Sequence, residues 1–121
     1  MAWVLIVEKD AQVRALAEGI IQEAGHQTLC AANPSEARAL IRTYELITVL
    51  FTDIESEADG VSELALAEEA VRLKPTLKVL YATAHDATDG TKALFVERSG
   101  SIAKPYTPSQ LLEALAALTE Q

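Results

Sequence analysis

The sequence contains a single cysteine and little positive charge, and each shortage excludes a class of protein. Cys30 is the single cysteine, so no disulfide can form within the chain and a reducing compartment is expected. Ten Lys and Arg residues stand against 18 Asp and Glu, which gives a net charge of −8. This balance argues against nucleic acid as a direct partner, because no basic patch is available to neutralise phosphates.

Long apolar runs are missing as well. None approaches the length that spans a membrane, and the first four residues, MAWV, do not resemble a signal peptide. We therefore expect a cytoplasmic protein without a membrane partner. The 121 residues are 50% hydrophobic and 23% charged, which predicts a single globular domain over residues 1–121.

Short apolar segments alternate with amphipathic ones along the whole chain. Strands are predicted at residues 3–7, 27–32, 47–52, 77–84 and 101–103. Helices are predicted from Val13 to Ala24, over 33–44, along a stripe from Leu64 to Val71 that ends at Lys74-Pro75, over 86–98, and over 107–118. Thr88, Asp89 and Gly90 interrupt the fourth helix. The first helix is expected to place Leu16 and its apolar neighbours in the core.

Several helix ends carry their own signals. Asp10 and Asn33 are predicted N-caps, and Thr107 is predicted to form a capping box with Gln110. Gly25 is expected to close the first helix. Alternating strands and helices indicate an α/β protein with a doubly wound parallel sheet that is covered on both faces.

Such sheets bind ligands at the carboxyl ends of their strands, and polar residues gather at that edge in this sequence. If the first and third strands are neighbours, Glu8, Lys9 and Asp53 converge on one shallow pocket. Thr83 ends the fourth strand and Lys104 follows the fifth, so both should face the same rim. Each residue also has a plain alternative role, such as a turn at Asp53, a strand-favouring residue at Thr83 or a solvated lysine at position 9.

Five segments carry a family resemblance: "VLIVEKD" (4–10), "LFTDI" (50–54), Gly60, "VLYATA" (79–84) and "AKPY" (103–106). In this order and spacing, and over essentially the whole chain, they resemble the receiver domain of bacterial response regulators in two-component signalling. The resemblance implies a flavodoxin-like (βα)5 fold with a five-stranded parallel sheet in the order 2-1-3-4-5. It also implies a cis peptide before Pro105.

By this resemblance Asp53 would be the phosphoacceptor, Thr83 the switch hydroxyl and Lys104 the lysine that contacts the phosphoryl group. Mg²⁺ would be held by Glu8, Asp53 and the backbone carbonyl of Glu55. The chemistry suits these roles, because a carboxylate can attack phosphorus and form an acyl phosphate while cations neutralise the developing charge. Such a chain is a signalling receiver rather than an enzyme.

One departure from the family pattern concerns the metal. Lys9 stands where the second acid of the pair is usually an aspartate that binds magnesium. Glu8 and Asp53 then face Lys9 and Lys104, so the formal charges cancel and Mg²⁺ binding should be weak. We hypothesise that the Lys9 ammonium lies near Asp53 and partly replaces the metal.

Two further departures concern the loop after Asp53 and the switch. The loop to Gly60 is one residue shorter than usual and reads ESEA over residues 55–58, where Met-Pro is common. The family's switch aromatic corresponds to Ser101. Tyr81 and Tyr106 are candidates to replace it, and the sequence does not choose between them.

The leading functional hypothesis is a response-regulator receiver that accepts a phosphoryl group on Asp53 from a histidine kinase or phosphotransferase. It would signal to a downstream protein through the 86–106 region. The alternative is a pseudo-receiver, a binding module that works without phosphorylation. A flavodoxin-like cofactor binder is a third possibility, but the first strand–helix turn lacks a Gly-rich phosphate cradle. The sequence does not indicate the kinase, the output partner, the oligomeric state or whether the domain stands alone.

Overall fold

The structure is a computed structural model that describes residues 2–54, 60–83 and 95–120. The strands are β1 (Trp3–Val7), β2 (Gln27–Ala31), β3 (Val49–Ile54), β4 (Lys78–Thr83) and β5 (Ser99–Ala103). The helices are α1 (Ala11–Glu23), α2 (Pro34–Thr43), α3 (Gly60–Leu73) and α5 (Pro108–Thr119). All strand pairs are parallel and the sheet order is β2-β1-β3-β4-β5, which confirms the predicted flavodoxin-like α/β fold.

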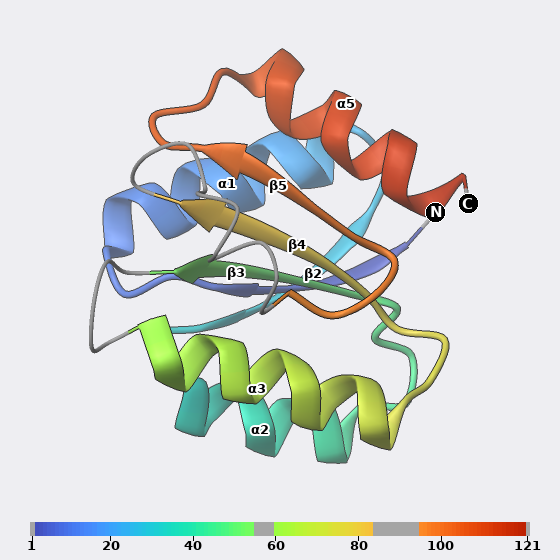
Figure 1. The fold of residues 1–121 in the computed structure, drawn as a ribbon. Coiled ribbons are helices and arrows are strands. Elements are labelled where there is room, and N and C mark those ends of the chain that lie inside the picture. Colours follow the sequence, from blue (N-terminus) through green and yellow to red (C-terminus); the bar gives the residue numbers. More distant parts are fainter. Residues whose placement is uncertain (1, 55–59, 84–94, 121) are drawn as a thin grey trace.

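The sheet lies between two layers of helices. Helices α1 and α5 cover one face, and α2 and α3 cover the other (Figure 1). Successive residues of β1 serve both layers, because Val4 and Ile6 pack toward α1 and α5 while Leu5 and Val7 pack toward α2 and α3. The apolar character of the whole strand therefore follows from burial on two sides.

The predicted helix caps are confirmed. The side chain of Asp10 accepts hydrogen bonds from two backbone N–H groups at the start of α1, and that of Asn33 accepts one at the start of α2. Thr107 and Gln110 form the capping box of α5. The Lys104-Pro105 peptide is cis. No described helix is long and apolar enough to cross a membrane.

Two glycines, one within α1 and one after it, provide a test of the backbone conformation. Gly19 lies within α1 with open space around the position of a Cβ atom, whereas Gly25 follows the helix with a φ of +96°. We expect Gly19→Ala to stabilise the fold by about 0.5–1 kcal/mol and Gly25→Ala to destabilise it by about 1 kcal/mol. Urea unfolding of the two variants checks this. Shifts of the same sign at both positions would contradict it.

Some predicted boundaries were wrong. The third strand covers Val49–Ile54 rather than 47–52, since its pairing with β4 continues past Thr52 to Ile54. Asp53 therefore lies within the strand. The fifth strand begins at Ser99 rather than at residue 101. The second strand ends one residue earlier than predicted, at Ala31, and the fourth begins one residue later, at Lys78. Residue 84, the predicted end of the fourth strand, lies outside the described residues.

Two helix predictions also need correction. Leu16 was expected in the core, but it is 62% exposed, because the stripe that α1 buries runs through Ala17, Ile20 and Ile21. Most of the predicted 86–98 helix lies outside the described residues. Its predicted end, residues 95–98, is not helical, and Arg98 has a φ of +58° that a right-handed helix excludes.

Candidate functional site

The carboxyl ends of four strands bring the predicted site residues to one edge of the sheet. Glu8 directly follows β1 and Lys104 directly follows β5. In β3, Asp53 is in register with Ala82 of β4, and Thr83 is in register with Ala103 of β5. The parallel register thus places Glu8, Asp53, Thr83 and Lys104 on the same rim of the sheet, as the sequence predicted.

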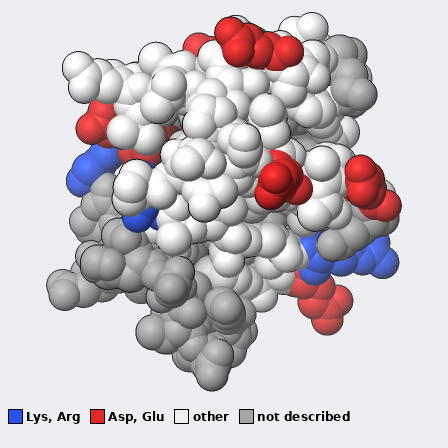
Figure 2. Space-filling view, turned by 90° about the horizontal axis from the view of Figure 1, so that it is seen from above, with Lys and Arg blue, Asp and Glu red and all other residues white. Residues whose placement is uncertain are grey.

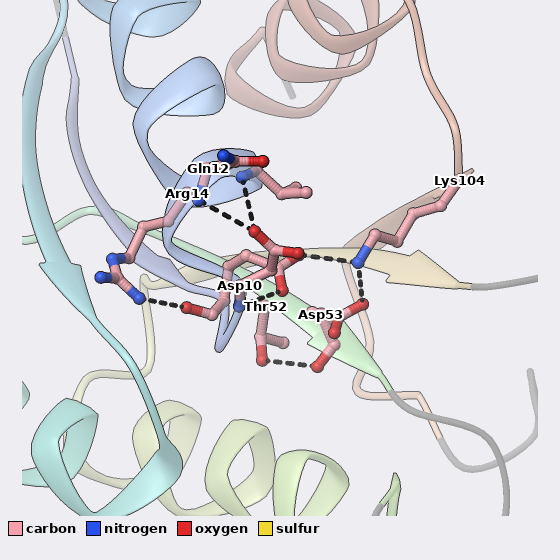
Figure 3. A network of polar contacts seen from close by, with 8 residues as sticks. Asp10, Gln12, Arg14, Thr52, Asp53 and Lys104 are labelled. Atoms are coloured by element: carbon pink, nitrogen blue, oxygen red, sulfur yellow. Dashed lines mark hydrogen bonds and ion pairs between the residues drawn. The ribbon is translucent and has the colours of Figure 1, made fainter.

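Lys104 joins the two predicted acidic residues. Its Nζ lies 2.7 Å from Oε1 of Glu8 and 3.0 Å from Oδ1 of Asp53 (Figure 3). The three side chains are largely removed from water, with exposed fractions of 7% for Glu8, 11% for Asp53 and 24% for Lys104. A shared cation between two shielded carboxylates is strongly held, because water screens the pair only weakly.

The loop between β1 and α1 fixes the carboxylate of Glu8. The backbone N–H of Asp10 donates to Oε2 of Glu8 at 3.1 Å, while the Asp10 side chain caps α1. The guanidinium of Arg14 donates to the Glu8 carbonyl at 2.8 Å (Figure 3). Arg14 was missed at the sequence level. Its position four residues after the N-cap allows the side chain to reach back over the first turn, but the spacing alone does not specify this contact.

The charges of the site shift the pKa of Lys104. Burial alone would lower this pKa, but the hydrogen bonds and charges of Glu8 and Asp53 together outweigh burial and raise it above the ordinary value. Burial raises the pKa of Tyr106, with a further rise from the negative charge of Glu8. The buried Tyr81 also has a raised pKa, mainly from desolvation.

These three shifts predict a loss of stability in alkali. Each group holds its proton more tightly in the folded state than in the unfolded state. Its contribution is therefore complete below about pH 10 and is lost as the pH rises through the folded pKa. We expect the urea midpoint to fall from about pH 10 upward. A midpoint that stays constant or rises in that range would contradict the assignment.

Threonines line the strands beside this cation. Thr83 is buried at the end of β4, with 7% of its surface exposed. Its carbonyl accepts the backbone N–H of Lys104 at 2.7 Å, which ties the ends of β4 and β5 together. Thr52 is fully buried, and its hydroxyl donates to the carbonyl of Asp53 at 3.2 Å. Movement of Thr83 would therefore act directly on the backbone that carries Lys104.

An aromatic pair lies on β4, two residues before Thr83. The ring of Tyr81 is fully buried and stacks on Phe95, with ring centroids 4.0 Å apart. The Tyr81 hydroxyl accepts the backbone N–H of Val96 at 3.2 Å. The exposed Ser101, at the position that the family pattern gives to an aromatic residue, is the register partner of Tyr81.

Tyr106, the other aromatic candidate, lies on the opposite face of the sheet. It is half-buried and meets Phe51 edge to face, with ring centroids 5.9 Å apart. Phe51 belongs to the core cluster under α1 and α5, whereas Tyr81 belongs to the cluster under α2 and α3. Tyr81 is thus the tyrosine that shares a face with Ser101, because register partners in parallel strands point to the same side.

The structure describes only some of the predicted Mg²⁺ ligands. Glu55 lies outside the described residues, and Lys9 is exposed. Within residues 2–54, 60–83 and 95–120, no group of three His, Cys, Asp or Glu side chains is placed to hold a metal. Magnesium requires oxygen ligands, and Glu8 and Asp53 each already contact the Lys104 ammonium. The described residues therefore do not fit a Mg²⁺ site.

Comparisons with known proteins show the family to which the chain belongs. The family model "Response regulator receiver domain" matches residues 4–116. The chain belongs to the response regulator receiver family. It is a signalling module of two-component systems rather than an enzyme. No curated protein sequence matches the chain significantly.

Solved structures show the same fold. A CheY-like receiver domain protein from Methanospirillum hungatei is 25% identical with a TM-score of 0.82, and the match covers 99% of this chain and 95% of that one. A response regulator from Thermotoga maritima is 20% identical with a TM-score of 0.85, covering 100% and 99%. TrrA of Thermotoga maritima, solved in complex with Mg²⁺-BeF, is 23% identical with a TM-score of 0.79, covering 98% and 99%.

Proposed function

We propose that this receiver accepts a phosphoryl group on Asp53 and passes the signal on through protein contacts. The observation that carries the proposal is the Lys104 ammonium, held between Asp53 and Glu8 at the rim of the sheet. Histidine kinases phosphorylate receiver domains, so a histidine kinase or a phosphotransferase is the expected donor. A cytoplasmic location follows from that choice of donor.

The transfer would use the carboxylate of Asp53 as nucleophile. One Asp53 oxygen attacks the phosphorus atom, a new acyl P–O bond forms, and the bond from phosphorus to the donor's leaving atom breaks with its electron pair. The carboxylate loses no proton in this step. Lys104 already contacts Asp53 and can follow the phosphoryl oxygens, which carry the negative charge. The hydroxyl group of Thr83 would then donate a hydrogen bond to one of these oxygens.

Output would pass through the 86–106 region, to which β5 belongs, and through α5, which packs beside β5. β5 carries no charged residue, and Glu113 is the single charged side chain within α5. Seen from the side of α5, the surface is largely uncharged (Figure 2). Lys104 begins the segment that joins these two elements, so a shift of Lys104 toward a phosphoryl group would move the edge of this surface.

A pseudo-receiver is the second candidate. Lys9 and Ser101 favour it, because each replaces a residue type on which the ordinary phosphorylation switch of the family depends. Weak Mg²⁺ binding is part of both proposals. In the pseudo-receiver the Glu8–Lys104–Asp53 contacts would be permanent structural contacts, and partner binding would be independent of Asp53 chemistry.

Intact mass spectrometry separates these two candidates. The wild-type protein is incubated with acetyl phosphate or with a histidine kinase, beside an Asp53→Asn control that keeps the size of the side chain. We expect one phosphoryl group to be added to the wild type and none to the variant. A wild-type mass that stays unchanged under both donors would overturn phosphoacceptance and leave the pseudo-receiver.

A further inference from the structure

We propose that the site balances its charge with its own lysines and works without a bound divalent cation, and that Glu8 is a positioning residue for Lys104 rather than a metal ligand. The part that concerns phosphorylation rests on the proposed function. The part that concerns metal binding does not, and it can be tested by itself.

The first argument is the use of the Glu8 carboxylate. Oε1 accepts from the Lys104 ammonium at 2.7 Å, and Oε2 accepts from the backbone N–H of Asp10 at 3.1 Å. Both oxygens of a side chain that is 7% exposed are therefore engaged by donors of the protein itself. A metal ion at Glu8 would have to displace Lys104 or break the loop that precedes α1, and either change leaves a buried group without its partner.

The second argument is the charge of the immediate surroundings. Glu8 and Asp53 supply two negative charges, while Lys104 and the adjacent Lys9 supply two positive ones. On α1, the Arg14 guanidinium donates to the Glu8 carbonyl and adds positive charge behind the loop. The Asp10 carboxylate accepts two backbone N–H groups at the start of α1 (Figure 3). Within the part of the chain that the structure describes, the three carboxylates and the three basic side chains cancel, which leaves no net negative charge there to attract a divalent cation.

The third argument is the geometry that Glu8 imposes on Lys104. The Lys104 ammonium contacts both carboxylates, at 2.7 Å from Glu8 and 3.0 Å from Asp53. The contact with Glu8 therefore holds the ammonium beside Asp53. Lys104 is a long flexible side chain, and without a second anchor it would lose this fixed position. Glu8 thereby acts on Asp53 through Lys104, with no contact of its own to a phosphoryl donor required.

Metal binding is tested by Mn²⁺ line broadening in NMR spectra of the whole chain. We expect no saturable broadening of the Glu8, Asp53 and Lys104 amides in the wild type at sub-millimolar Mn²⁺. Lys9→Asp should strengthen binding at these amides about 100-fold, since it changes the local charge by two units. Arg72→Asp, an exposed site near the end of α3, changes the net charge equally and should have no such effect. Sub-millimolar binding to the wild type, or no gain in Lys9→Asp, would overturn the proposal.

The role of Glu8 is tested by a double-mutant cycle on the phosphorylation rate. Glu8→Gln keeps the size of the side chain and removes its charge, and we expect a rate about tenfold lower than wild type. In a Lys104→Met background the same change should have no further effect, because Glu8 acts through Lys104. If Glu8→Gln lowers the phosphorylation rate equally in both backgrounds, Glu8 does not act through Lys104, and its assignment as a positioning residue is overturned.

The same assay measures the need for metal. Phosphorylation of the wild type should proceed at equal rates in EDTA and in millimolar Mg²⁺, and a strict requirement for Mg²⁺ would overturn the proposal. If neither condition gives a phosphorylated product, the proposed function fails. The Mn²⁺ titration still decides the metal-binding proposal in that event.

Discussion

Lys104→Met is expected to slow phosphorylation of Asp53 by about 100-fold or more, while the protein remains folded. The Lys104 ammonium contacts the carboxylates of both Glu8 and Asp53, at 2.7 and 3.0 Å. The substitution removes the ammonium that would neutralise the negative charge of the incoming phosphoryl group at Asp53. The measurement is the rate of mass gain with acetyl phosphate.

The same variant should lose stability by about 1–3 kcal/mol, because removal of the shared cation leaves Glu8 and Asp53 facing each other. This range lies below that of a fully buried pair, since 24% of the Lys104 side chain is exposed. Lys78→Met is the matched control. Lys78 donates to the carbonyl of Leu118 at 2.8 Å, at the opposite end of β4, and its loss should leave the phosphorylation rate unchanged.

Equal rates in Lys104→Met and in the wild type would contradict the role of Lys104 in neutralising the phosphoryl group. Equal losses in Lys104→Met and Lys78→Met would contradict it as well, because they would trace the effect to general damage. Lys104→Arg adds a useful comparison. Arginine keeps the positive charge but presents it in a planar fork. A phosphorylation rate of Lys104→Arg below that of the wild type would show that the geometry of the ammonium matters, and an equal rate would show that its charge is sufficient.

The sequence was sufficient to predict the fold and the edge of the sheet at which the polar residues meet. This succeeded because strands buried on both faces are continuously apolar, so the end of each apolar run marks the sheet edge where Glu8, Thr83 and Lys104 lie. Asp53 was harder to place. A charged residue ends an apolar pattern, yet backbone pairing with β4 extends the strand one residue beyond it.

Contacts that depend on tertiary packing were not predictable. The hydrogen bond from Arg14 to the Glu8 carbonyl joins two residues of one loop and helix, but nothing in the spacing specifies that the guanidinium turns back toward β1. The stack of Tyr81 on Phe95 depends on how the residues before β5 pass over β4. The exposure of Leu16 shows the same limit, because an apolar residue at the margin of a helical stripe can face either the core or the solvent.

Tyr81→Ala is expected to destabilise the fold by about 3–5 kcal/mol, the largest stability effect among the substitutions considered. Tyr81 is fully buried in the cluster under α2 and α3, so its truncation removes buried apolar surface and leaves a cavity. The stacked contact with Phe95 is lost at the same time. Urea unfolding measures the effect.

Tyr81→Phe separates the ring from the hydroxyl. Phenylalanine keeps the stack on Phe95 but cannot accept the N–H of Val96, so a loss of about 1 kcal/mol is expected. Hydrogen exchange locates the change. The Val96 amide should exchange faster in Tyr81→Phe, whereas amides in the middle of α3 should follow only the change in global stability. Unchanged exchange at Val96 would show that the hydroxyl does not hold this backbone.

The position of this contact gives the variant its functional meaning. Tyr81 and Thr83 are two residues apart in β4, and the segment held by the Tyr81 hydroxyl leads directly into β5 and then to Lys104. Ser99 reinforces the turn by donating its hydroxyl to the Val96 carbonyl at 2.7 Å. If phosphorylation draws Thr83 toward Asp53, a backbone fixed through Tyr81 will move with β4.

Tyr81→Phe should therefore keep phosphorylation of Asp53 while reducing the changes in the NMR spectrum that phosphorylation causes at residues 95–98. Changes of wild-type size there would show that the signal reaches this segment by another route.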